Sequence, residues 1–354
     1  MSNKNLARRT KAEISFAGVN ITKSIQPYLL SLSYTDNEEG EADDLQLTLQ
    51  DRDGLWLEKW LAEAVETAAA GQLKMQAVLV PENWQGGGQD RLLDCGTFEL
   101  DSVTAQAPPA TVTIKGNSLP YSARIRQTLR SKAWEAYSLS GIAGQLAAEN
   151  GLGLMYEAAN DPFYSRAEQV QTSDIAFLTK LCQNAGISLK ATGQLLVLFD
   201  QAAYEQKPSV YTIQRGNGAY SKYKLAVGSA DTQYSSCRVS YVDPVTGECI
   251  SGVAKIEDYK PKAKSNQQLE ITAKVANAAE AKALAEKHLR LHNKYAHTAS
   301  FSLPGNPQLA AGLCVQLAGF GGWSGKYIIS QARHSLSGSG YSTQIELRKV
   351  LEGY

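Results

Sequence analysis

Residues 43–60 of this chain read DDLQLTLQDRDGLWLEKW. Leu45, Leu47 and Leu49 alternate with polar residues, and a repeat of two residues predicts a strand with one apolar and one polar face. The next four residues, Asp-Arg-Asp-Gly, have the composition of a turn that ends the strand. The stretch therefore predicts a half-buried strand, a pattern that returns along much of the chain.

An acidic run comes directly before this strand, with six carboxylates in nine residues and Gly40 among them. Further upstream, YLLSLSY at 28–34 alternates in the same way, so the two strands predict a long β-hairpin with an acidic loop. Because like charges repel, we expect a solvated hairpin tip rather than a buried site. The six carboxylates are Asp36, Glu38, Glu39, Glu41, Asp43 and Asp44.

The composition is that of a folded soluble protein. The chain has 354 residues, enough for two or three domains, with 43% hydrophobic and 20% charged residues. Thirty-five basic residues balance thirty-five acidic ones, so we expect no nucleic-acid specificity and no attraction to an anionic membrane. The five cysteines are odd in number and form no CxxC motif, which indicates reduced and mostly buried thiols.

The N-terminus is basic and lacks the apolar core of a signal peptide, and no apolar run is long enough to span a membrane. We therefore expect synthesis in the cytoplasm and no stable membrane insertion. The basic N-terminus of one copy could pair with the acidic loop of another, although two independent solvated segments are the favoured interpretation.

The spacing of apolar and turn residues predicts three domains. Residues 1–118 read as strands with one short helix at 58–70, which favours a closed or nearly closed antiparallel barrel. Residues 119–205 predict a small α/β domain, with helices capped at Ser138 or Ser140 and at Thr172 or Ser173. Residues 206–354 return to strands, with an accessory helix at about 277–295. Asn277, followed by Glu280 three residues later, is the expected N-cap of this helix. The predicted fold class is α+β, mainly β, with two antiparallel β-barrel domains and an α/β insertion between them.

An internal repeat supports two related barrels. The strand at 96–104 opens with glycine and is followed by a turn and a second strand at 111–114. The same order of glycine-opened strand, turn and strand recurs at 325–333 and 342–345. Such self-similarity indicates a duplicated structural unit.

Candidate metal ligands are few. His288 and His292 have the i, i+4 spacing of a helical metal pair, and His297 is near, but no HExxH occurs. Because His288 lies on an apolar stripe, a packed histidine is the favoured interpretation. His334 ends a strand, which favours a structural hydrogen bond. The DRDG sequence at 51–54 resembles the start of a calcium loop but lacks the required glutamate at the twelfth position, so a turn is favoured.

Catalytic motifs are also missing from the sequence. It contains no GxSxG and no phosphate-binding glycine loop, since the glycines at 86–88 and 319–322 precede no Lys-Ser/Thr helix start. Its carboxylates are too numerous to single out a glycosidase pair. We expect no catalytic residues, no cofactor and no metal site, and therefore a protein that is not an enzyme.

Three stretches resemble the tail-hub proteins of contractile phage tails, the late control D proteins and their Gram-positive prophage relatives, which R-type bacteriocins also carry. They are YLLSLSYTDNEEGEADDLQLTLQDRDGLW at 28–56, SDIAFLTKLCQNAGISLKATGQLLVLFD at 173–200, and the last 80 residues. The last stretch keeps the order of the family: an alanine-rich helix, a strand, Gly305-Asn306, Ala311-Gly312, a Gly-Lys-Tyr strand, Arg333-His334 and Gly340-Tyr341.

The resemblance implies two tail-tube-like barrels per chain and a homotrimer, so that a threefold ring presents a sixfold face. It implies a structural adaptor in the baseplate of a virion or injection particle. Its partners would be the hexameric tail tube protein, the trimeric central spike protein, and other baseplate and tape-measure components. The acidic loop is a candidate contact to the neighbouring ring.

Two alternative functions remain open on the sequence. A tail-associated cell-wall hydrolase would need paired carboxylates or a Cys-His pair in a cleft. A carbohydrate-binding or spike-like tail module would show aromatic or β-helix repeats.

Overall fold

The computed structural model of the chain describes residues 7–56, 73–84, 90–119, 124–192, 194–228, 233–244, 246–257, 259 and 266–351. Strands dominate these residues, which confirms the predicted mainly β class with some helix. The helix predicted at 58–70 and the glycine loop at 86–88 lie outside the described residues.

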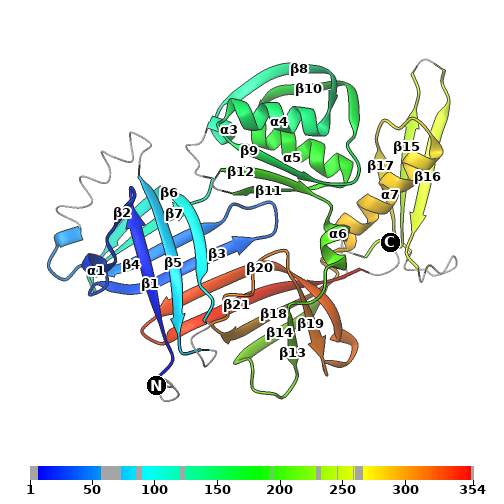
Figure 1. Cartoon of the computed structure of the whole chain (residues 1–354). Helices are drawn as coiled ribbons and strands as arrows, with labels where there is room; N and C mark the ends of the chain where they lie inside the picture. Colours follow the sequence, from blue (N-terminus) through cyan, green and yellow to red (C-terminus); the bar gives the residue numbers. More distant parts are fainter. Residues whose placement is uncertain are drawn as a thin grey trace.

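The first part of the chain folds as strands around an apolar core that includes the alternating leucines of the opening stretch (Figure 1). Leu45, Leu47 and Leu49 have no exposed surface, whereas the residues between them are half-buried, as a repeat of two requires. Its elements are β1 (Arg9–Phe16), β2 (Val19–Asn20), α1 (Thr22–Ile25), β3 (Leu29–Asn37), β4 (Asp44–Gln50), β5 (Lys74–Glu82), β6 (Leu93–Gln106) and β7 (Thr111–Asn117).

The middle of the chain has its own core, formed by two helices packed against two small sheets. Its elements are α3 (Arg124–Gln127), β8 (Leu129–Ser138), α4 (Leu139–Glu149), β9 (Gly153–Glu157), β10 (Phe163–Ser173), α5 (Asp174–Ala185), β11 (Ser188–Thr192), β12 (Leu195–Phe199) and α6 (Gln201–Gln206). Ser138 caps α4 and Ser173 caps α5, as predicted, because each hydroxyl accepts a hydrogen bond from a first-turn N–H. Gly186 ends α5 with a φ of 67°, the left-handed conformation that favours glycine there.

The last part of the chain returns to strands around a third core. Its elements are β13 (Tyr211–Gln214), β14 (Lys222–Val227), β18 (His297–Pro304), β19 (Cys314–Ala318), η2 (Gly321–Trp323), β20 (Gly325–Ser337) and β21 (Gly340–Lys349). Between β14 and β18 the chain leaves this core to form β15 (Ser236–Val242), β16 (Cys249–Lys255), β17 (Gln268–Thr272) and α7 (Ala278–Asn293).

The first and last parts share one continuous sheet, and the described residues form no closed barrel. The predicted arrangement of two closed or nearly closed barrels is therefore not confirmed. The strand order is β14-β18-β21-β20-β3-β4-β7-β6-β5-β1-β2, with β19 and β13 branching from β20. The physical reason is that β3 and β20 pair with each other, from Asn37 opposite Gln331 to Ser31 opposite Ser337. Each strand thereby satisfies the backbone groups that a sheet edge would leave unpaired.

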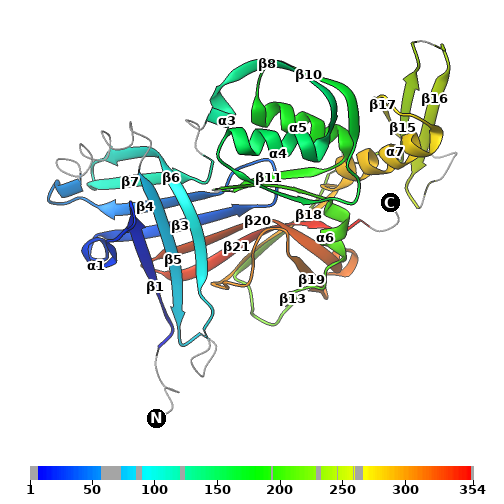
Figure 2. The same ribbon diagram turned by 45° about the horizontal axis from the view of Figure 1, so that its top comes forward.

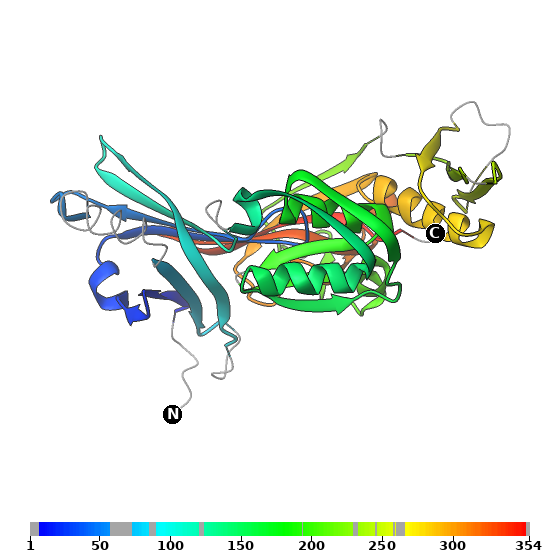
Figure 3. The same ribbon diagram turned by 90° about the horizontal axis from the view of Figure 1, so that it is seen from above.

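Within this sheet two four-stranded sets have the same connectivity. The first set is β3-β4-β7-β6 and the second is β14-β18-β21-β20, and in both the chain visits the spatial positions in the order first, second, fourth, third. The repeat noted in the sequence lies at equivalent positions, since Val103 pairs with Ile114 in β6–β7 and Ala332 pairs with Ile345 in β20–β21. Viewed from above, both sets lie along one long band (Figure 3).

The module of β15, β16, β17 and α7 was not separated from the second barrel by the sequence analysis. Its three-stranded sheet projects beside the main sheet, with α7 packed on one face (Figure 2). Asn277 caps α7 as predicted, accepting a hydrogen bond of 2.9 Å from the Glu280 N–H. The helix approaches the strand closely at Gly252, where a Cβ atom would lie 2.3 Å from the backbone nitrogen of Lys282.

Gly252→Ala should therefore destabilise this module. The added methyl group meets backbone rather than a flexible side chain, so the helix must shift, and we expect a loss of about 1–3 kcal/mol in unfolding free energy. Urea unfolding measured by circular dichroism checks this. Gly338→Ala is the matched control, because a Cβ there meets nothing within 4 Å. Equal stabilities of the two variants would contradict the packing described.

Candidate functional site

The acidic loop between β3 and β4 is largely buried, and the predicted solvated hairpin tip is wrong. Asp36, Glu38 and Asp43 expose 7%, 2% and 6% of their surface. Glu39 and Asp44 are half-buried, and Glu41 is exposed. Burial of so much negative charge requires nearby cations. The structure supplies them from segments more than a hundred residues away.

Lys190 on β11 neutralises one side of the loop. Its Nζ lies 2.6 Å from Asp36 Oδ1 and 3.4 Å from Asp43 Oδ1. The other oxygen of Asp36 accepts a 2.8 Å hydrogen bond from the Ala311 N–H, and Asp43 accepts one of 2.8 Å from the Asn37 N–H. The loop is thus tied to the middle part of the chain and to the segment before β19.

Burial raises the pKa of Asp43 to about 6, against the effect of Lys190 and with a further contribution from the Asp36 charge. Burial by itself would lower the pKa of Lys190, but the charges of Asp36 and Asp43 outweigh it and raise that pKa. The lysine is therefore charged at neutral pH and holds the two carboxylates together.

Arg348 on β21 neutralises the other side of the loop and has no exposed surface. Its Nη2 donates to Glu38 Oε1 at 2.7 Å and its Nε to Glu38 Oε2 at 3.1 Å, a bidentate pair. Its Nη1 bonds to Glu205 on α6. Burial raises the pKa of Glu38, opposed by Arg348.

Arg290 on helix α7 and Lys294, the residue directly after this helix, complete the cluster. Arg290 bonds to Glu205 and Lys294 bonds to Glu39. We call the whole cluster the buried charged junction. Its members are Asp36, Glu38, Glu39, Asp43, Lys190, Glu205, Arg290, Lys294 and Arg348. The junction joins the β3–β4 loop to β11, α6, α7 and β21. The elements that it connects therefore come from the first, the middle and the last part of the chain.

The charged junction is suited to holding elements together rather than to catalysis. Each of its charged groups is paired with an opposite charge within the chain, so none is poised as an acid or base facing a cleft. The ring-contact role of the six carboxylates stays a prediction. Of the six, Glu41 is exposed and the other five are buried or half-buried.

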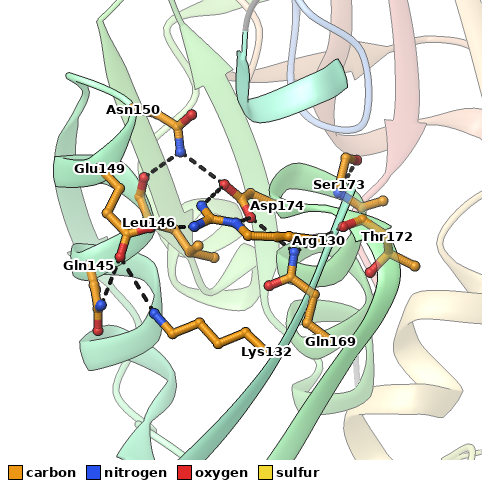
Figure 4. A network of polar contacts seen from close by, with 11 residues as sticks. Arg130, Lys132, Gln145, Leu146, Glu149, Asn150, Gln169, Thr172, Ser173 and Asp174 are labelled. Carbon is orange, nitrogen blue, oxygen red and sulfur yellow. Dashed lines mark hydrogen bonds and ion pairs between the residues drawn. The ribbon is translucent and has the colours of Figure 1, made fainter. Parts of the chain in front are cut away.

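A second polar network lies inside the middle part of the chain (Figure 4). Asp174, the first residue of α5, accepts hydrogen bonds from Arg130, from Gln169 at 2.9 Å and from Asn150 at 3.0 Å. Arg130 also donates to Glu149 at 2.6 Å. Although burial opposes it, these hydrogen bonds lower the pKa of Asp174. The network fixes the ends of α4, α5, β8 and β10 relative to one another and has the character of a structural clamp.

Two of the histidines, His334 and His288, are buried. His334 is fully buried, with Nδ1 2.8 Å from the Tyr341 hydroxyl and Nε2 2.9 Å from the Leu309 carbonyl oxygen, which confirms the predicted structural hydrogen bond. Burial lowers its pKa to about 4, so the ring is neutral at physiological pH. His288 is buried on α7, as predicted for a packed histidine. The described residues contain no group of three or more His, Cys, Asp or Glu side chains arranged to hold a metal ion.

The DRDG sequence forms a turn, in agreement with the prediction. The Gly54 N–H donates to the Asp51 carbonyl oxygen at 3.2 Å, and the Asp51 side chain accepts a 2.8 Å hydrogen bond from the Trp56 N–H. The carboxylate of Asp51 thus serves the backbone of its own turn.

A family model described as phage tail baseplate hub (GPD) matches residues 119–340, well over half of the chain. The chain belongs to this baseplate hub family. Two curated relatives agree: the probable baseplate hub protein of Escherichia phage 186 is 29% identical over 231 residues, and that of Escherichia phage P2 is 30% identical over 239 residues. Each match covers 64% of this chain and 55% of the relative, so the hub chain spans about half the length of these relatives.

Solved structures show the same fold at low identity. A tail protein from Neisseria meningitidis has a TM-score of 0.69 at 13% identity, covering 96% of this hub chain and 97% of that chain. A prophage tail protein from Shewanella oneidensis has a TM-score of 0.66 at 13% identity, covering 96% and 98%. A type VI secretion component from E. coli, described as similar to T4 tail proteins gp27 and gp5, has a TM-score of 0.52 at 10% identity, covering 92% and 75%.

Among the described residues of the hub chain, none of the helices has the length and apolar character needed to cross a lipid bilayer. Helix α7, the longest helix in the part of the chain that the structure describes, carries charged residues along its length.

Arg348→Met tests the charged junction. The substitution leaves Glu38 and Glu205 buried without their shared cation, and removing one partner of a buried pair costs about 3–5 kcal/mol. We expect a loss of that size in chemical unfolding. Arg166→Met is the matched control, since Arg166 is 60% exposed and pairs at the surface with Glu168, where the loss should stay below about 1 kcal/mol. Similar losses for the two variants would show that the junction carries little stability.

Asp43→Asn tests the raised pKa. Because the folded carboxyl has a pKa of about 6 and the ordinary value is 3.8, the folded state binds the proton more tightly. The tighter proton binding stabilises the folded state below pH 3.8, and this stabilisation is lost as the pH rises through 6. The variant, which cannot ionise, should therefore gain stability relative to wild type between pH 4 and pH 7, by up to about 3 kcal/mol.

Unfolding at a series of pH values checks this difference. Glu41→Gln, on the exposed carboxylate of the same loop, is the control and should show a smaller change. A stability difference for Asp43→Asn that does not vary with pH would refute the assignment.

Proposed function

We propose that this hub chain is a structural, non-catalytic component of a contractile tail baseplate, and that three copies form a ring joining the hexameric tail tube to the trimeric central spike. Family membership supports the baseplate location. One observation carries the ring: each chain places two four-stranded sets of equal connectivity side by side in one sheet. Three copies would present six similar sets, so that a threefold body can meet a sixfold tube.

Each of three units of the chain has a role in this ring. Residues 1–118 and 206–354 are the two tail-tube-like units that build the ring wall, and residues 119–205 are an α/β unit that packs outside it. The separate apolar cores of these segments support this division. The module of β15–β17 and α7 projects from the second unit.

The proposed partners and the proposed location follow from membership of the baseplate hub family. The tail tube protein, the spike and other baseplate and tape-measure components would contact the two ends of the ring. The chain would be made in the bacterial cytoplasm and assembled there into a virion or a tail-like particle. The paired state of the buried carboxylates supports a structural role over a hydrolase.

The mass of the purified full chain in solution tests the ring. Light scattering coupled to size exclusion, over a range of protein concentrations, should give three times the mass of one chain at the upper concentrations. A chain that stays monomeric or dimeric throughout, even with the tube protein added, would contradict the proposal.

A further inference from the structure

The sequence contains the pair Asn-Gly twice, at 150–151 and at 217–218. In such a pair the backbone nitrogen of the glycine can attack the side-chain carbonyl carbon of the asparagine, because glycine has no side chain to shield its nitrogen. The attack needs a glycine N–H that is free of a hydrogen bond, an asparagine amide group that can leave, and access to water. The structure meets these conditions at one of the two pairs.

The pair at 217–218 is exposed, in the turn between β13 and β14 (Figure 1). Asn217 Oδ1 accepts a 3.0 Å hydrogen bond from the Ala219 N–H, which folds the side chain back over the backbone of Gly218 and draws electrons away from the carbonyl carbon. In the part of the chain that the structure describes, no acceptor bonds to the Gly218 N–H. A Cβ atom at Gly218 would meet nothing within 4 Å, so water reaches the reacting atoms.

At the pair 150–151 the corresponding groups are held. Asn150 is half-buried, and its Nδ2 donates to the Leu146 carbonyl oxygen at 2.8 Å and to Asp174 Oδ2 at 3.0 Å (Figure 4). The Gly151 N–H donates to the Ala148 carbonyl oxygen at 3.1 Å. An attack there would break all three hydrogen bonds, one of them to a charged carboxylate. The polar network around Asp174 therefore protects Asn150.

We infer that Asn217 is a site of spontaneous deamidation in the folded chain, with water as the co-reactant. The Gly218 nitrogen bonds to Asn217 Cγ, the Cγ–Nδ2 bond breaks, and the amide nitrogen leaves as ammonia with the proton of the Gly218 N–H. Water then opens the resulting succinimide ring at either of its carbonyl groups. The product is aspartate or isoaspartate, and nothing is oxidised or reduced.

The product differs from the original chain in charge and, as isoaspartate, in the length of its backbone. The new carboxyl group is ionised at neutral pH, so each event moves the chain from a formal net charge of zero to a negative one. Isoaspartate adds a methylene group to the backbone of the turn, across which the Gly216 N–H bonds to the Tyr220 hydroxyl at 3.3 Å. The hub chain should therefore become more acidic with age, whether or not it forms a ring.

Storage of the purified full chain at mildly alkaline pH, followed by peptide mass spectrometry, tests this site. The peptide with Asn217 should convert into two products of equal mass, each heavier by the exchange of an NH2 group for OH. The peptide with Asn150 should convert at least about tenfold more slowly, because its hydrogen bonds must break first. In guanidinium chloride, where both pairs are unfolded, the two rates should become similar.

Asn217→Gln is the matched variant, because its longer side chain would have to close a larger and less favourable ring. On native isoelectric focusing the wild-type chain should gain an acidic form during storage, and this variant should lack that form. Equal rates at Asn150 and Asn217 in the folded chain would overturn the inference. A folded chain in which Asn217 stays unchanged for as long as the unfolded chain needs to convert would overturn it as well.

Discussion

The rest of this hub chain depends on the pairing of β3 with β20. The buried charged junction lies next to this pairing and reinforces it. The strand pairing ends at Asn37 opposite Gln331, and the next residue, Glu38, bonds through its N–H to the Ser330 carbonyl oxygen. The side chain of Glu38 then meets Arg348. Replacing a whole buried ion pair by apolar residues is often neutral, whereas an arrangement that separates the two partners leaves a buried charge unpaired and is strongly disfavoured. The angle between the two four-stranded sets is thereby fixed by backbone and charge together.

A fixed angle between two similar units has a geometric consequence. When the same contact is repeated from unit to unit, the assembly closes into a ring or continues as a helix, depending on the rotation per contact. Within one chain the contact is the pairing of β3 with β20, and both strands belong to the same polypeptide. The middle unit, tied to the junction through Lys190, adds bulk outside this band without interrupting its strand order.

The sequence predicted what depends on neighbours along the chain. The repeat of two in Leu45–Leu49, the caps at Ser138, Ser173 and Asn277, and the hydrogen-bonded His334 all follow from local patterns and appear in the structure. The acidic loop was misjudged because its compensating charges are remote: Arg348 lies 310 residues from Glu38. No local pattern marks Lys190, Lys294 or Arg348 as its partners. For the same reason the sequence analysis gave two barrels where one sheet runs through, since the β3–β20 pairing joins distant segments.

The most direct test of this account is an image of the assembled particle viewed along its axis by electron cryo-microscopy. We expect a closed threefold ring with six similar lobes, one for each four-stranded set. A ring with three lobes alone, or an assembly of another symmetry, would contradict the proposed ring.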